Sequence, residues 1–183
     1  MAGKYVSIDS TELRRFVEKL EKAGRGGEFK KELSRFLDSL GVDFLAKAED
    51  FAISAESVDT RHLVGSLKIG EEGNIFVSGE DGLWIEVGTN VDYASYVNDG
   101  HWLNAKGVDM RWVPGHWTGP PGDKNAKFIY EPGAKTGMLL KQDWVKGSHF
   151  FDNAVRKMET DVIPKSMEKN MQEWINKYFS DLL

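Results

Sequence analysis

The chain has 183 residues, of which 40% are hydrophobic and 29% charged, as in one soluble globular domain. It contains no cysteine, which excludes disulfide scaffolds, thiolate zinc sites and cysteine nucleophiles. Its formal net charge of −5 weighs against a dedicated nucleic-acid-binding protein, which usually carries a basic stripe. The N-terminal residues lack the apolar run of a signal peptide, and no stretch approaches the roughly 20 apolar residues that span a bilayer. We therefore expect a soluble protein that is made in the cytoplasm and is not bound to a membrane.

Two helices are predicted at the start of the chain. The first follows Asp9 or Ser10, either of which can cap it, and its apolar side chains recur at i, i+3, i+4 and i+7: Leu13, Phe16, Val17 and Leu20. Glycines between residues 24 and 27 end it. The second runs from about Glu28 to about Ala52 with a wide apolar stripe of Phe29, Leu33, Phe36, Leu37, Leu40, Phe44, Leu45, Ala48 and Phe51. Such a wide stripe predicts that the helix lies against a large surface, most simply a sheet.

The period of the apolar residues changes after this helix. Residues 66–69, 74–77 and 83–87 are predicted to form short strands, because β-forming side chains there are separated by glycine-containing turns. Their alternation predicts an antiparallel meander with one covered face. A short helical segment near residues 92–98 follows and ends at Asp99-Gly100.

Residues 101–147 have a different composition from the rest of the chain. They contain four of the five prolines and four of the six tryptophans: Pro114, Pro120, Pro121, Pro132, Trp102, Trp112, Trp117 and Trp144. We expect long loops here, with short strands near Arg111, Phe128 and Leu139. Long loops in a compact domain are usually functional or disordered, and tryptophan-rich loops are seldom disordered. We therefore interpret the segment as an ordered insertion that packs on the sheet or on a neighbouring subunit.

A helical pattern returns at the C-terminal end. One apolar stripe comprises Phe150, Phe151, Ala154, Val155 and Met158, and a second comprises Met167, Met171, Trp174, Tyr178 and Leu182. Pro164 lies between the stripes and is expected to kink the helix or to open a new one. The second stripe is expected to belong to the core, and contact with a neighbouring subunit is the less favoured interpretation.

Residue patterns that would indicate catalysis are missing. The four histidines are His62, His101, His116 and His149, and none forms a helical His-x-x-x-His pair. Gly100-His101-Trp102 and Gly115-His116-Trp117 repeat a tripeptide, but a catalytic zinc site needs three converging protein ligands. The glycine-rich stretches lack a phosphate-binding pattern, and no Gly-x-Ser-x-Gly elbow is present. We expect no catalytic residue, no metal and no cofactor.

Three segments, in order, resemble the phage tail-completion (head–tail joining) family of small neck proteins. Residues 58–67, Val-Asp-Thr-Arg-His-Leu-Val-Gly-Ser-Leu, are similar to the family's Asp-Thr-Gly-x-Leu-x-x-Ser-Leu. We expect Asp59 or Thr60 to cap one helical turn, Leu63 to anchor it, and the chain to enter a strand at Ser66-Leu67. Residues 147–155 occupy the place of the family's Ala-Arg-Pro-Phe-Leu-x-Pro-Ala stretch, which leads into the last helix, although Ser148-His149 replaces Arg-Pro.

The most specific of these segments spans residues 87–100. It reads Val-Gly-Thr-Asn-Val-Asp-Tyr-Ala-Ser-Tyr-Val-Asn-Asp-Gly and resembles the family's strand–turn–helix corner. Its signature residues are Gly88, Thr89, Asn90, Tyr93 and Tyr96. We expect Gly88 to release the chain from the strand and Asn90 or Asp92 to cap the helical turn. The two tyrosines, three apart, should then lie on one helix face. A corner of this kind is a fold signature and not a reaction site.

The resemblance implies an α+β fold, with an antiparallel sheet of short strands packed against two N-terminal helices and a long C-terminal helix. It implies one neck domain over residues 1–183, with 101–147 as an insertion. It also implies a structural, non-enzymatic virion protein that is assembled in the bacterial cytoplasm and works in a ring, usually of six copies. The implied partners are other copies of the chain, the tail tube or tail terminator protein, and the head-closure or connector protein. DNA would pass through the lumen without sequence-specific binding.

A closed ring needs a heterologous interface, and we place one side of it on the insertion. Trp112 and Trp117 are the expected anchors, because tryptophan is enriched in interface hot spots, and Trp102 and His116 are expected beside them. The acidic balance of the chain predicts an acidic or neutral lumen, since phosphates adhere to lysine and arginine.

Two other functions are compatible with the sequence. The tryptophan-rich loops also suit a carbohydrate- or peptide-binding module, which would be a monomer with ligand-quenched tryptophan fluorescence. The Gly-His-Trp loops leave open a metal-assisted hydrolase, which is less favoured. Within the neck class, the sequence does not separate tail termination from head–tail joining, contractile from non-contractile tails, or intact phages from tail-like particles.

Overall fold

The protein is described by a computed structural model that covers residues 4–9, 11, 15, 17–18, 21, 26–55, 61–79, 82–120 and 123–178. The fold is α+β, as predicted. The chain divides into two compact units. The first comprises Met1–Asp99 with Ser148–Leu183, and the second comprises Gly100–Gly147. No helix in the described ranges is long and apolar enough to cross a bilayer.

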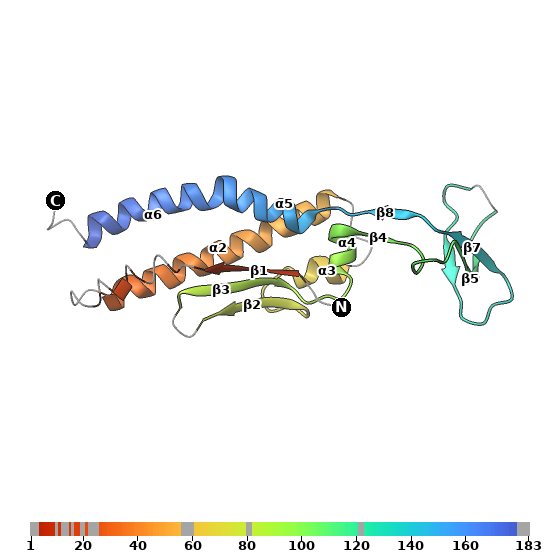
Figure 1. The fold of residues 1–183 in the computed structure, drawn as a ribbon, viewed down its shortest axis with the longest axis horizontal. Helices are drawn as coiled ribbons and strands as arrows, with labels where there is room; N and C mark the ends of the chain where they lie inside the picture. Colours follow the sequence, from red (N-terminus) through yellow and green to blue (C-terminus); the bar gives the residue numbers. More distant parts are fainter. Residues whose placement is uncertain are drawn as a thin grey trace. The chain divides into compact units, whose positions relative to one another are not determined.

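The first unit is built in three layers (Figure 1). An antiparallel sheet in the order β1-β3-β2 is formed by β1 (Lys4–Asp9), β3 (Trp84–Thr89) and β2 (Asn74–Ser78). The long helix α2 (Gly26–Ser54) packs on one face of this sheet. The C-terminal helices α5 (Phe150–Lys157) and α6 (Ile163–Tyr178) pack on α2, where Phe44 meets Phe151 edge-to-face at 5.0 Å.

The position of α2 between two layers explains its wide apolar stripe. Every predicted stripe residue is buried except Phe51, which is half-buried and packs against the core. At Gly41 the helix approaches the sheet so closely that an added Cβ would lie 2.9 Å from Ile85 Cδ1 and from Phe76 Cε2. The glycine that interrupts the stripe therefore allows close packing between helix and sheet.

The strands differ from the prediction at two places. Strand β1 was not predicted at all, because its apolar residues, Tyr5, Val6 and Ile8, do not give an alternation long enough to identify a strand. Residues 66–69 were predicted as a strand, but Ser66 ends helix α3 (Arg61–Ser66) and successive turns follow it up to Asn74. The Ser66 hydroxyl donates to the Leu63 carbonyl at 2.7 Å, which closes a helical turn where the apolar pattern alone suggested extension.

Predictions for the N-terminal helix fall mostly outside the described residues. Thr11, Arg15, Val17, Glu18 and Glu21 are helical, and Val17 is buried in the core. The predicted cap Ser10 and the other stripe residues, Leu13, Phe16 and Leu20, lie outside the described residues, as do the predicted caps of α3, Asp59 and Thr60.

The C-terminal helix contains one wider turn. A π-helical segment (Met158–Val162) separates α5 from α6, and the Ile163 N–H donates to the Met158 carbonyl five residues earlier. Pro164 stands in the first turn of α6, where its missing N–H is tolerated. The helical backbone continues from α5 through this wider turn into α6, so the proline changes the hydrogen-bond pattern without ending the helix. Trp174 is buried in edge-to-face contact with Phe29 and Phe36, and Met167 and Met171 pack partly buried against the core. These three residues of the second stripe therefore belong to the core; the Tyr178 side chain and Leu182 lie outside what the structure describes.

The second unit consists of short antiparallel strands. Strand β4 (Gly100–Trp102) pairs with β8 (Trp144–Lys146). Strand β5 (Met110–Trp117) lies between β6 (Phe128–Tyr130) and β7 (Gly137–Lys141). The three predicted strands near Arg111, Phe128 and Leu139 are confirmed, whereas β4 and β8 were not predicted.

Candidate assembly surface

The signature corner begins inside the sheet. Gly88 lies within β3, opposite Tyr5 of β1 and Ile75 of β2, and the strand continues to Thr89. The prediction that Gly88 releases the chain from the strand was therefore wrong. Its role is close packing: with a φ of 155°, an added Cβ would lie 2.3 Å from the Lys4 carbonyl oxygen.

Thr89 fastens the end of the sheet to helix α3. It is fully buried, and its hydroxyl lies 2.7 Å from that of Ser66, which is also fully buried. The Ser66 hydroxyl already donates to Leu63, so the Thr89 hydroxyl is the donor between them. Thr89 Oγ1 also accepts from the Val91 N–H at 3.1 Å. Buried hydroxyls are costly unless all their partners are present, so this pair fixes the corner.

The other signature residues sit around the turn that follows. Asn90 is exposed, and Tyr93 is half-buried against the core just before helix α4 (Ala94–Asp99). Tyr96 lies within α4 and is exposed. Tyr93 stands directly before the first residue of α4, and its carbonyl accepts the Val97 N–H at 3.1 Å, so of the two tyrosines only Tyr96 lies within the helix. Thr89, and not Asn90 or Asp92, accepts the bond that closes the turn.

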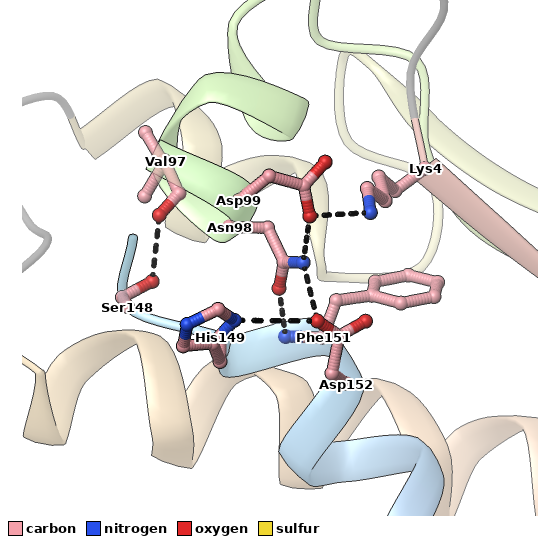
Figure 2. A network of polar contacts seen from close by, with 8 residues as sticks. All are labelled: Lys4, Val97, Asn98, Asp99, Ser148, His149, Phe151 and Asp152. Atoms are coloured by element: carbon pink, nitrogen blue, oxygen red, sulfur yellow. Dashed lines mark hydrogen bonds and ion pairs between the residues drawn. The ribbon is translucent and has the colours of Figure 1, made fainter. Parts of the chain in front are cut away.

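Asn98 joins the corner to helix α5 (Figure 2). Its side chain is fully buried, and its Oδ1 accepts a hydrogen bond from the Phe151 N–H at 2.9 Å. Its Nδ2 donates to Asp99 Oδ1 at 2.7 Å and to Asp152 Oδ2 at 2.9 Å. Both amide hydrogens and the amide oxygen are therefore used. Asn98 was not singled out from the sequence, where it is one polar residue in a helical turn.

The backbone on both sides of the second unit is tied together at this place. The Val97 carbonyl accepts from the Ser148 N–H at 2.8 Å and from its hydroxyl at 3.0 Å, as Figure 2 shows for the hydroxyl. The Asn98 carbonyl accepts from the His149 N–H at 3.0 Å. We call residues 97–99 and 148–152 the corner clamp. It closes the first unit where the chain leaves for the second unit and where it returns.

Lys4 connects the corner clamp to β1, an edge strand of the sheet. Lys4 Nζ donates to Asp99 Oδ1 at 2.8 Å, which links β1 to the end of α4 (Figure 2). This hydrogen bond from Lys4 lowers the pKa of Asp99 below its ordinary 3.8; partial burial opposes the shift, and the bond from Asn98 adds to it.

The second unit exposes the apolar side chains that a domain normally buries. Every fully buried hydrophobic side chain in the described residues lies in the first unit. Ten of the large apolar side chains that are exposed lie in the second unit: Trp102, Val108, Met110, Trp112, Trp117, Ile129, Tyr130, Leu139, Trp144 and Val145. Exposed apolar clusters of this kind mark interaction sites.

One of these clusters lies on one face of the β5–β7 strand pair. Trp112 pairs with Leu139 and Met110 pairs with Lys141 across the two strands. Leu139 is 61% exposed, Met110 56% and Trp112 52%, and Lys141 is exposed beside them. The intervening residues Val113, Met138 and Leu140 are half-buried on the opposite face. We call Met110, Trp112, Leu139 and Lys141 the β5–β7 face.

The two Gly-His-Trp repeats have the same local design. Trp102 meets Trp144 edge-to-face at 5.2 Å, and Trp117 meets Phe128 at 5.4 Å, each across a strand pair. The partner ring also covers the glycine two residues earlier. A Cβ on Gly100 would lie 2.8 Å from the Trp144 ring, and one on Gly115 2.7 Å from the Phe128 ring. The repeated tripeptide is therefore explained by packing.

Of the four predicted interface residues, Trp102, Trp112, His116 and Trp117, all except His116 belong to the exposed apolar set. His116 is exposed on β5, and its Nδ1 lies 3.3 Å from Glu131 Oε2. Among the described residues, no group of three or more His, Asp or Glu side chains is close enough to hold a metal ion.

The two units differ in charge. The second unit contains seven Lys and Arg against four Asp and Glu, a net +3, whereas the rest of the chain contains 17 against 25, a net −8. The whole-chain value of −5 conceals this division. The exposed apolar set therefore lies on the basic unit.

Comparisons with known proteins identify the family. The model of the family described as "Bacteriophage HK97-gp10, putative tail-component" matches residues 14–100, and the match ends where the second unit begins. "Uncharacterized protein YqbI" of Bacillus subtilis (strain 168) is 43% identical over 170 residues, which cover 91% of this chain and 97% of that protein. "Phage-like element PBSX protein XkdI" of the same organism is 40% identical over 158 residues, covering 86% and 92%. No solved structure matches significantly.

These matches define a structural protein related to phage tails. The chain belongs to the HK97-gp10-like family of phage tail components. The predicted resemblance to a family of phage tail and neck proteins is thereby confirmed.

Proposed function

We propose that the chain is a subunit of the neck of a phage, prophage or tail-like particle, where it completes or terminates the tail and joins it to the head connector. Its partners are further copies of itself in a ring, the tail tube or tail terminator protein, and the head-closure or connector protein. A ring of six is carried over from the family resemblance. The role is structural and not enzymatic, and residues 1–183 act as one neck domain with the 101–147 insertion.

One observation carries this proposal. Within the described residues, the second unit buries no large apolar side chain completely, yet ten are exposed on it. A unit of this kind gains most of its hydrophobic stabilisation only when another chain covers it. A tail component whose apolar surface is completed by neighbours is suited to a permanent joint between assemblies.

Trp102, Trp112, His116 and Trp117 are the residues on which we place the subunit contact. The three tryptophans are between 47% and 57% exposed, so about half of each residue is packed against its own unit and about half is open to a partner. Tryptophan side chains anchor interfaces when they are covered at the centre of the contact. The lumen of the ring is expected to be acidic or neutral, because DNA must pass without adhering to lysines and arginines.

Deletion of the gene tests this function. An induced lysate of the deletion strain is examined by electron microscopy, with a strain that carries the gene in trans as the control. Filled heads beside separate tails of normal length support a joining role, and overlong tails support a terminator role. Normal intact particles would exclude the neck assignment, and ligand-quenched tryptophan fluorescence of a monomer would then favour a binding module.

A further inference from the structure

The three-stranded sheet has a second face that α2 does not cover. Phe76, Ile85 and Val87 point toward Gly41 of α2, so the residues that alternate with them point away. On β3 and β2 these are Trp84, Glu86 and Val77.

Strand β1 contributes to the same outward face. Tyr5 pairs with Gly88, which alternates with the inward Val87 on β3. Tyr5 is 56% exposed and Val77 is 49% exposed, so solvent reaches this side of the sheet. We call Tyr5, Val77, Trp84 and Glu86 the outer sheet face.

The outer sheet face and the β5–β7 face have complementary chemistry. Each presents apolar side chains around one charge: Glu86, directly opposite Val77 on the sheet, and Lys141, directly opposite Met110 on the strand pair. Ile75 of β2, which is half-buried, also lies on the outer side of the sheet. The units that carry them have net charges of −8 and +3. Opposite potentials guide two surfaces together and fix their register, while the apolar side chains supply most of the stabilisation.

We propose that the β5–β7 face of one copy packs on the outer sheet face of the next copy, with Lys141 against Glu86. This inference rests on the proposed function and deepens it, because it names both sides of the subunit contact. The two faces are different surfaces of the same chain, so the contact is heterologous. A heterologous contact repeated from copy to copy produces a closed ring when its rotation closes.

The chain has no cysteine, which makes disulfide trapping a clean test. Val77→Cys and Leu139→Cys are introduced separately into the full chain, and the two purified variants are oxidised alone and as a mixture. The mixture is expected to form a disulfide-linked heterodimer, and each variant alone is expected to stay largely uncrosslinked. As the matched control, Ile53→Cys on α2, which is about as exposed as Val77, replaces it and should not crosslink with Leu139→Cys.

Three results would overturn the inference. Dimerisation of Leu139→Cys alone would show that the β5–β7 faces pair with each other. A monomeric disulfide in a variant that carries both Val77→Cys and Leu139→Cys would show that the two faces meet within one chain. No heterodimer, either in concentrated purified protein or in purified particles, would show that the faces do not meet. Trapping in purified protein does not depend on the neck assignment, so its outcome and that of the gene deletion are separable.

The charge pair gives a second, independent measurement. Glu86→Lys and Lys141→Glu, each added to its own cysteine variant, should lower the yield of heterodimer by about tenfold, because like charges are then apposed. Combining both changes in the mixture should restore the yield. Glu71→Lys, on an exposed turn, is the control for net charge and should leave the yield unchanged. A combination that is no better than the single changes would contradict the Lys141–Glu86 contact.

Discussion

Asn98 caps a helix that begins more than fifty residues later in the chain. Its Oδ1 accepts the Phe151 N–H at 2.9 Å, in the first turn of α5. The residue in the N-cap position, His149, has a left-handed backbone with a φ of 54° and makes no side-chain cap hydrogen bond. A buried amide from another element therefore does what an N-cap side chain normally does.

Replacement of Asn98 should destabilise the first unit. Asn98→Ala leaves the Phe151 N–H without its acceptor and empties a buried site, so we expect a loss of about 2–3 kcal/mol in the free energy of unfolding. Urea denaturation followed by circular dichroism measures it. Asn90→Ala, at an exposed position of the same corner, should change the value by less than about 0.5 kcal/mol. Equal effects of the two substitutions would show that the corner clamp is not a stabilising contact.

Gly41 should tolerate no side chain. An added methyl group would lie 2.9 Å from both Ile85 and Phe76, so Gly41→Ala should destabilise by about 1–3 kcal/mol despite the better helix propensity of alanine. Gly65→Ala, in helix α3 with nothing within 4 Å of the added Cβ, is the matched control and should be neutral or stabilising by up to about 1 kcal/mol. Thermal unfolding of the two variants distinguishes them. A stabilised Gly41→Ala would mean that α2 lies farther from the sheet than described.

The Ser66 and Thr89 hydroxyls should be energetically coupled. Ser66→Ala and Thr89→Val should each lower the free energy of unfolding by about 1–2 kcal/mol, because each leaves a buried hydroxyl or N–H without a hydrogen-bond partner. The double variant should lose less than the sum, by about 1 kcal/mol, since the second change removes the group that the first left unpaired. A double-mutant cycle from denaturant unfolding measures this coupling, and strict additivity would show that the two side chains act independently.

Asp161 should give the C-terminal helix a pH-dependent contribution. Hydrogen bonds from Lys157, at 2.6 Å, and from Lys165 lower the pKa of Asp161 from 3.8 to about 2. Because the folded-state pKa is depressed, the contribution is present above about pH 4 and is lost as the pH falls through about 2. Asp161→Asn should therefore destabilise near neutral pH and have no effect at the acid end. Glu159→Gln, an exposed position in the same π-helical turn, is the control for the charge change. A stability difference between wild type and Asp161→Asn that does not vary with pH would contradict the assignment.

Much of the architecture could be predicted from periodicity. The wide stripe of α2 predicted its burial, and β2, β3, α4 and the three strands of the 101–147 insertion were found near the predicted positions. Strand β1 was missed because its pairing with β3 brings together residues about eighty positions apart, which a local pattern does not report. The end of the helix at Arg61–Ser66 was predicted as a strand, because the apolar pattern does not show the hydrogen bond from the Ser66 hydroxyl to the Leu63 carbonyl.

The candidate assembly surface was only partly predictable. Tryptophan content drew attention to Trp102, Trp112 and Trp117, but not to Leu139 or Lys141, which join Trp112 only through the register of β5 and β7. Asn98 gave no local signal, since its partners Asp152 and Phe151 come from a segment beyond the second unit. The difference in net charge between the units can be seen only when the boundaries of the units are known, and composition alone does not give those boundaries.

The most direct test of the central claim returns the gene to the deletion strain with the β5–β7 face altered. Trp112→Ala with Leu139→Ala is compared with a control that carries Ile53→Ala and Ile69→Ala, two exposed apolar positions in the first unit. Joined particles are counted by electron microscopy, and incorporation of the protein is measured in purified particles. We predict that the β5–β7 variant stays folded but is absent from particles, which remain unjoined or carry tails of abnormal length, whereas the control restores them. Normal particles containing the β5–β7 variant would contradict the claim that this surface builds the neck.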